Sequence, residues 1–136
     1  MGSGLNKINM PFKLLIIDDD KQLMAMLYDF LSNLKYDVVS AFDGLEGLKL
    51  LETEKQGFDL VITDLVMPKI SGNYLILTIK QKFPDTPVIA ITGWGAYPEA
   101  FAIETQADKV LEKPFELSEL DKAIKDLLSP KMTFAG

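Results

Sequence analysis

The sequence contains no cysteine, no histidine and no arginine. The lack of cysteine excludes disulfide bonds and thiol chemistry, and it fits a reducing compartment such as the cytoplasm. The lack of histidine removes the commonest general base and the commonest metal ligand. Carboxylate oxygens are then the main candidates for holding a metal ion, and such ligands favour hard cations such as Mg²⁺.

Long hydrophobic runs are also missing. No apolar stretch approaches the ~18 residues that cross a bilayer, and the start of the chain has no signal-peptide core. Both absences predict a cytoplasmic protein without a membrane segment. The net charge of −6 comes from 20 acidic and 14 basic residues. There is no basic stripe interleaved with aromatic residues, which argues against direct nucleic-acid binding.

The length of 136 residues is enough for one domain with a single core. Residues 1–11 show no hydrophobic periodicity and are interpreted as a disordered N-terminal segment or a remnant of cloning. Residues 12–129 are expected to form the domain, and residues 130–136 a short C-terminal tail.

Short apolar segments alternate with amphipathic segments along the domain. We expect strands at residues 13–17, 36–41, 60–64, 87–92 and 108–112, and helices at 21–34, 43–55, 73–83, 98–106 and 117–128. Strict alternation predicts a parallel sheet with helices on both faces. The expected fold is a flavodoxin-like (βα)₅ doubly wound α/β domain with strand order 2-1-3-4-5. Helical spacing places several residues toward the core, among them Leu23, Met24, Met26, Leu27, Leu45, Leu48 and Leu51.

Polar residues follow the apolar strands at the points where the strands end. Asp18 and Asp19 follow the first strand, Asp64 ends the third, Thr92 ends the fourth and Lys113 follows the fifth. In a parallel sheet these ends share one edge, where open α/β sheets place their ligands. Asp20, the residue after this acidic pair, is expected to cap the first helix.

Converging carboxylates repel one another unless a cation lies among them. With oxygen ligands only, Mg²⁺ is the natural cation, and it can also neutralise a phosphoryl oxygen. Asp64 could then act as a nucleophile and form an aspartyl-phosphate, while Lys113 and the Thr92 hydroxyl bind the remaining phosphoryl oxygens. Taken singly, each of these residues has a commoner role as a turn, cap or surface residue. Only their joint placement at successive strand ends favours a functional site.

In this order and at these separations the motifs resemble the receiver domain of two-component response regulators. The resemblance runs from about Lys13 to Leu128. Four segments carry it: Leu15–Asp19, Thr63–Pro68 with Gly72, Ile91–Gly93 and Lys113–Phe115.

The resemblance implies that Asp64 is the phosphoacceptor, receiving its phosphoryl group from a histidine kinase or a histidine phosphotransfer protein. It implies Mg²⁺, with Mn²⁺ as an alternative, held by Asp18, Asp19, Asp64 and the backbone carbonyl of Val66. Thr92 would be the switch hydroxyl, and Lys113 the phosphate-binding lysine before a cis proline. Such a domain is not an enzyme, because it assists only its own phosphorylation and dephosphorylation. It would act on a downstream protein partner or a fused output domain, and phosphorylation-dependent homodimerisation is left open.

The sequence departs from the common receiver pattern at four positions. Val110 stands where many receivers carry Tyr or Phe, and Ser71 stands where many carry Asp. Val66 and Gly95 offer no polar side chain to position an attacking water. Three alternatives stay open: a flavodoxin-like cofactor binder, a phosphatase with an aspartyl nucleophile on strand one, and a receiver-like protein that binds partners without phosphorylation.

Overall fold

The computed structural model describes residues 11–67, 69–93 and 106–133. Within these residues the chain forms five strands and four helices: β1 (Lys13–Ile17), α2 (Lys21–Asn33), β2 (Asp37–Ala41), α3 (Gly44–Thr53), β3 (Leu60–Asp64), α4 (Gly72–Lys82), β4 (Val88–Thr92), β5 (Lys109–Glu112) and α6 (Leu117–Thr133). Residues 98–105, where the sequence predicts a further helix, and Gly95 lie outside the described residues.

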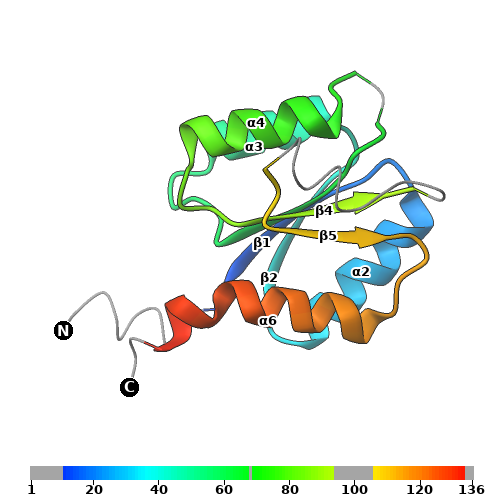
Figure 1. Ribbon diagram of the computed structural model, residues 1–136, viewed down its shortest axis with the longest axis vertical. Coiled ribbons are helices and arrows are strands. Elements are labelled where there is room, and N and C mark those ends of the chain that lie inside the picture. The colour runs from blue at the N-terminus through cyan, green and yellow to red at the C-terminus, as the bar shows by residue number, and fades with distance from the viewer. Residues whose placement is uncertain (1–10, 68, 94–105, 134–136) are drawn as a thin grey trace.

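The strands form one sheet in the order β2-β1-β3-β4-β5, and each neighbouring pair is parallel. The predicted flavodoxin-like order is therefore confirmed. All strands run in the same direction, so their carboxyl ends share one edge, to which the arrowheads of β4 and β5 point on the right of Figure 1. The residues that follow the strands meet at this edge.

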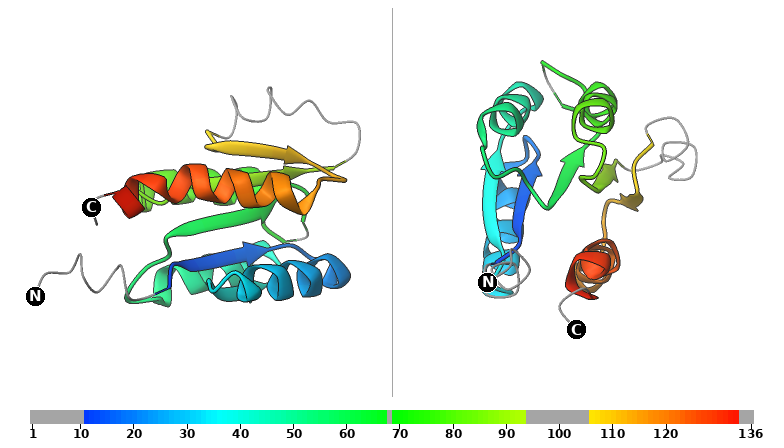
Figure 2. Two further views of the ribbon diagram at one scale, coloured as in Figure 1. Left: turned by 90° about the horizontal axis from the view of Figure 1, so that it is seen from below. Right: turned by 90° about the vertical axis from the view of Figure 1, so that its left-hand side faces the viewer.

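Helices cover both faces of the sheet. α2 and α6 lie on one face, and α3 and α4 lie on the other, as the end-on view in Figure 2 shows. Alternate residues of β1 serve the two cores, because Leu14 and Ile16 pack toward α2 and α6 while Leu15 and Ile17 pack toward α3 and α4. Burial on both faces explains why this strand is an unbroken apolar run.

Three of the four described helices have a capping side chain where they begin at the carboxyl edge. Asp20 Oδ1 accepts hydrogen bonds of 3.1 Å from two backbone N–H groups of α2, as the sequence predicts. Asp43 accepts from Glu46 N at 2.8 Å and Ser71 from Tyr74 N at 3.2 Å. The positive ends of these helix dipoles therefore face the edge that gathers the acidic residues.

Two of the core positions named above are exposed instead. Met26 is 46% exposed and Leu45 is 39% exposed. In α2 the buried stripe consists of Met24, Leu27 and Leu31, spaced three and four apart, and Met26 falls on another side of the helix. In α3 the buried positions are Gly44, Gly47 and Leu51, so glycines take the places nearest the sheet and the helix lies close against it.

The last helix is longer than the sequence predicts. α6 continues past Leu128 and Pro130 to Thr133. Lys131 Nζ donates a 2.9 Å hydrogen bond to the carbonyl oxygen of Asp59, just before β3, and this contact holds the final turns against the sheet. None of the helices in the described part of the chain has both the length and the apolar composition required to cross a bilayer.

Candidate functional site

Three carboxylates meet at the carboxyl edge of β1 and β3. Ile17 pairs with Thr63 in the sheet, so Asp18 and Asp64 follow at the same level on neighbouring strands. One carboxylate oxygen from each of Asp18, Asp19 and Asp64 lies within 4.8 Å of the other two. Asp18 is 1% exposed and Asp64 is 5% exposed, whereas Asp19 opens to solvent. This arrangement concentrates negative charge in a largely buried space.

Local backbone contacts hold Asp18 in place. Its Oδ1 accepts a 2.9 Å hydrogen bond from Asp20 N, which closes a tight turn between β1 and α2. Its own N–H donates to the carbonyl oxygen of Ala41 on β2 at 3.2 Å. Asp20 caps α2, as the sequence predicts, and it does not join the carboxylate group.

Lys113 brings the balancing positive charge. It follows β5, and its N–H donates to the carbonyl oxygen of Thr92 at 2.9 Å. Its Nζ lies 3.1 Å from Asp18 Oδ2 and 3.8 Å from Asp64 Oδ1. The peptide bond between Lys113 and Pro114 is cis.

The Thr92 hydroxyl lies at the same edge. Asp64 pairs with Ile91 across β3 and β4, so Thr92 is the next residue toward the edge. Thr92 is buried, and its Oγ1 has no hydrogen-bond partner among the described residues. A buried hydroxyl without a partner is unusual in a native structure.

The chain matches the family model of the response regulator receiver domain over residues 14–125. This match covers most of the domain and includes Asp18, Asp64, Thr92 and Lys113. The chain belongs to the response regulator receiver domain family.

Curated relatives of this receiver domain are longer proteins. The transcriptional regulatory protein GlrR of Escherichia coli is 40% identical over 119 residues, which are 87% of this chain and 26% of GlrR. The alkaline phosphatase synthesis transcriptional regulatory protein PhoP of Bacillus subtilis is 32% identical over 117 residues, which are 85% of this chain and 48% of PhoP. The chain thus spans about a quarter and about half of the lengths of these relatives.

Solved structures match the receiver domain over almost their whole length. A response regulator receiver domain protein from Clostridium thermocellum has a TM-score of 0.82 and 31% identity, covering 90% of this chain and 98% of that one. The response regulator TrrA from Thermotoga maritima, solved in complex with Mg²⁺-BeF, has a TM-score of 0.74 and 31% identity, covering 86% and 99%.

The environment of Asp64 shifts its protonation. The pKa of Asp64 is raised from 3.8 to about 6, chiefly because the carboxyl group is buried and secondly because the Asp18 carboxylate lies beside it. The Lys113 ammonium and the backbone N–H groups of Val66 and Leu65 act in the opposite direction. The net upward shift means that one lysine does not fully balance the charge of the carboxylates.

The donor set of this receiver domain fits a divalent cation. Its three carboxylates are hard oxygen ligands, which Mg²⁺ prefers. Asp18 Oδ2 is buried and makes no hydrogen bond, although Lys113 lies beside it as an ion pair. An unsatisfied buried carboxylate oxygen in a group with excess negative charge is an expected ligand for a cation.

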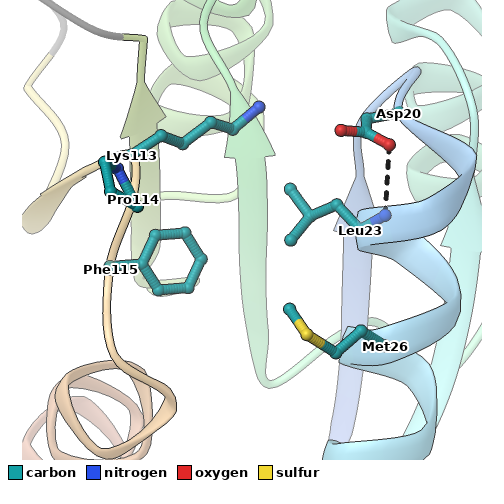
Figure 3. Close-up of a pocket in the computed structure, with 6 residues that line it drawn as sticks. All are labelled: Asp20, Leu23, Met26, Lys113, Pro114 and Phe115. Carbon is teal, nitrogen blue, oxygen red and sulfur yellow. Dashed lines mark hydrogen bonds between the residues drawn. The ribbon is translucent and has the colours of Figure 1, made fainter.

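A pocket of about 420 Å³ opens beside the site. Figure 3 shows Leu23 and Met26 of α2 facing Pro114 and Phe115 across it, with Lys113 and Asp20 at one end. The sequence analysis places Met26 in the core, whereas in the structure its side chain is exposed and lines this pocket. The signal that reveals it is positional, since Met26 lies two residues after the buried Met24 and therefore cannot share its face.

Proposed function

We propose that this receiver domain accepts a phosphoryl group on Asp64 from a phosphohistidine of a partner protein, in a reaction that requires Mg²⁺. The observation that carries the proposal is the group of Asp18, Asp19 and Asp64 oxygens within 4.8 Å of one another, with Lys113 Nζ 3.8 Å from Asp64. A nucleophile, a cation site and a fixed ammonium ion are the parts that phosphoryl transfer needs, because it depends mainly on positioning and charge neutralisation.

The carboxylates of Asp18, Asp19 and Asp64 would hold the ion together with the backbone carbonyl of Val66, and Mn²⁺ would substitute for Mg²⁺. When bound, the ion neutralises the carboxylates and the oxygens of the transferred group. The solved complex of TrrA with Mg²⁺-BeF supports the proposal, since it comes from a protein of the same fold that is 31% identical.

In the transfer step, an Asp64 carboxylate oxygen attacks phosphorus while the phosphorus–nitrogen bond of the donor breaks. The imidazole leaves with the electron pair of that bond, and the new phosphorus–oxygen bond forms on Asp64. The donor histidine belongs to another protein, because this sequence contains none. Lys113 and the unpartnered Thr92 hydroxyl bind the phosphoryl oxygens.

The geometry disfavours the alternative of a phosphatase with its nucleophile on β1. Asp18 Oδ1 is engaged by Asp20 N, and Asp20 itself caps α2. A cofactor binder of flavodoxin type would hold its phosphate after β1, where the acidic residues repel it. We infer that the partners are a histidine kinase or a histidine phosphotransfer protein, and a downstream protein or fused output domain.

The test is labelling of the purified chain by acetyl phosphate with and without Mg²⁺. We expect wild-type protein to be labelled only with Mg²⁺, and Asp64→Asn to fold normally and take no label. Asp19→Asn is the matched variant for the cation, and it should need much more Mg²⁺ for the same labelling. Mg²⁺-dependent labelling of Asp64→Asn would show that the phosphoacceptor is another residue.

A further inference from the structure

A glycine outside the carboxylate group lies against the loop that follows Asp64. We name residues 65–71 the β3–α4 loop; residue 68 lies outside the described part of the chain. Gly44, the first residue of α3, is buried against this loop. A Cβ atom on Gly44 would lie 2.5 Å from the carbonyl oxygen of Ile70 and 2.9 Å from its Cβ. Only a residue without a side chain permits so close an approach of the two backbones.

The β3–α4 loop cannot easily move away from Gly44. The Ile70 side chain packs against the core cluster under α3 and α4. Lys69 has a left-handed backbone, with φ of 71°, which a lysine adopts only where its surroundings impose it. Lys69 Nζ also lies 3.3 Å from Asp43 Oδ2, but Lys69 is 61% exposed, so this ion pair contributes little. The backbone contact at Gly44 is therefore the rigid part of the arrangement.

The same loop carries groups that reach the site. The N–H of Val66 faces the Asp64 carboxylate closely enough to lower its pKa. At the other end of the loop, Gly72 N donates to the Leu65 carbonyl oxygen at 3.1 Å, which ties the start of α4 back to the residue after Asp64. A shift of Ile70 would be transmitted through Ser71 and Gly72 to Leu65, which lies between Asp64 and Val66.

We propose that Gly44 is a positioning residue for the cation site. Its missing side chain lets Ile70 rest against the first turn of α3, and this contact sets the backbone at Val66 beside Asp64. The inference deepens the proposed function and rests on it. It adds a residue from α3, an element that contributes no ligand to the carboxylate group.

The experiment compares Gly44→Ala with Gly57→Ala in the full chain, using Mg²⁺ titration by calorimetry at a temperature where circular dichroism shows each variant folded. Gly57 is a matched control because its φ of 74° makes alanine strained, while no atom lies within 4 Å of its added Cβ. We expect Gly44→Ala to weaken Mg²⁺ binding by about tenfold, as loss of a residue that orients ligands does. Gly57→Ala should lower the melting temperature but leave Mg²⁺ affinity within about twofold, because it shares no contact with the site.

A second variant, Ile70→Ala, keeps the carbonyl oxygen and the Cβ atom that face Gly44 but removes the side chain that anchors the loop to the core. It carries the test if Gly44→Ala does not fold, and it should also weaken Mg²⁺ binding. The inference is overturned if the folded Gly44→Ala variant binds Mg²⁺ as tightly as the wild type. If Gly44→Ala does not fold, the same result for Ile70→Ala overturns it. The proposed function still stands in either case, provided that the wild-type chain binds Mg²⁺ and is labelled. Failure of the wild-type chain to bind Mg²⁺ or accept phosphate would overturn both.

Discussion

Asp64 is the residue at which burial and charge act most strongly. Its pKa is raised from 3.8 to about 6 by burial and then by Asp18. An acid with a raised pKa binds its proton more tightly in the folded state than in the unfolded state. The stability that it contributes is therefore fully present below pH 3.8 and is lost as the pH rises through about 6.

This shift predicts a pH-dependent difference between wild-type protein and Asp64→Asn without Mg²⁺. Between about pH 4 and pH 7 the wild type should lose on the order of 3 kcal/mol of unfolding free energy relative to the variant, at 1.36 kcal/mol for each pKa unit. Urea unfolding of both proteins at several pH values measures the difference. The lowered pKa of Asp43 acts with the opposite sign but is common to both proteins, so it cancels. Parallel pH profiles would contradict the prediction.

The buried Thr92 hydroxyl leads to a second prediction. Thr92→Val keeps the shape of the side chain and removes a hydroxyl that has no partner in the described residues. We expect the free energy of unfolding to rise by about 1 kcal/mol, because burial of an unpaired polar group is costly. Beryllofluoride should bind the variant more weakly, because a donor to its fluorine atoms is lost.

Thr63→Val is the matched control for Thr92→Val. Thr63 is equally buried, but its Oγ1 donates a 3.0 Å hydrogen bond to the carbonyl oxygen of Asp64. The valine should therefore lower the free energy of unfolding by about 1 kcal/mol. Thermal unfolding of the two variants should give shifts of opposite sign, and equal shifts would show that the partner of the hydroxyl does not matter.

At this scale the sequence predicts where the polar residues lie better than it predicts their partners. Asp18, Asp64, Thr92 and Lys113 each lie at the end of a strand or directly after it, and a parallel sheet brings such residues to one edge. The pairing of Lys113 with Asp18 at 3.1 Å could not be predicted, because it depends on the path of the chain after β5 and on the lysine rotamer.

At the scale of elements, the apolar patterns predict the strands and the start of each described helix to within about a residue. The apolar patterns do not predict correctly which helix residues are buried, because that depends on how closely each helix approaches the sheet. Leu45 looks like a core residue by spacing, but Gly44 and Gly47 take the buried side of α3. The end of α6 was missed because Pro130 resembles a stop signal, while the contact of Lys131 with Asp59 comes from a distant part of the chain.

We expect the phosphoryl donor of the proposed function to approach over the pocket between α2 and the segment after β5. Met26→Asp places a charge among Leu23, Pro114 and Phe115 without altering the carboxylate group. We expect transfer from a cognate phosphohistidine protein to slow by about tenfold or more, since a charge in an apolar contact is costly. Labelling by acetyl phosphate, which needs no protein contact, should be unchanged. Equal slowing of both reactions would mean that the substitution disturbs the site itself.

At the scale of the whole molecule, one sheet supports two cores, and a long-range polar contact joins the last described helix to the segment before β3. The partly buried Lys131 of α6 reaches Asp59, which lies 72 residues earlier. Lys131→Met should lower the free energy of unfolding by about 1 kcal/mol, because the aliphatic chain is kept and the hydrogen bond is lost. Lys125→Met is the control, because the Lys125 ammonium group is exposed and its pair with Asp121 should contribute little to stability. Chemical denaturation measures both, and equal losses would show that the contact of Lys131 has no special weight.

The position of Lys113 affects how the strands of the sheet are held together at the carboxyl edge. Its ammonium group is nearer to Asp18 than to Asp64, so the ion pair reaches from the end of β5 across β4 and β3 to β1. A phosphate on Asp64 would attract the ammonium group to β3, which is closer to β5 in the strand order. Phosphorylation would then remove the ion pair that links the end of β5 to the end of β1. The end of β5 would be free to shift relative to β1.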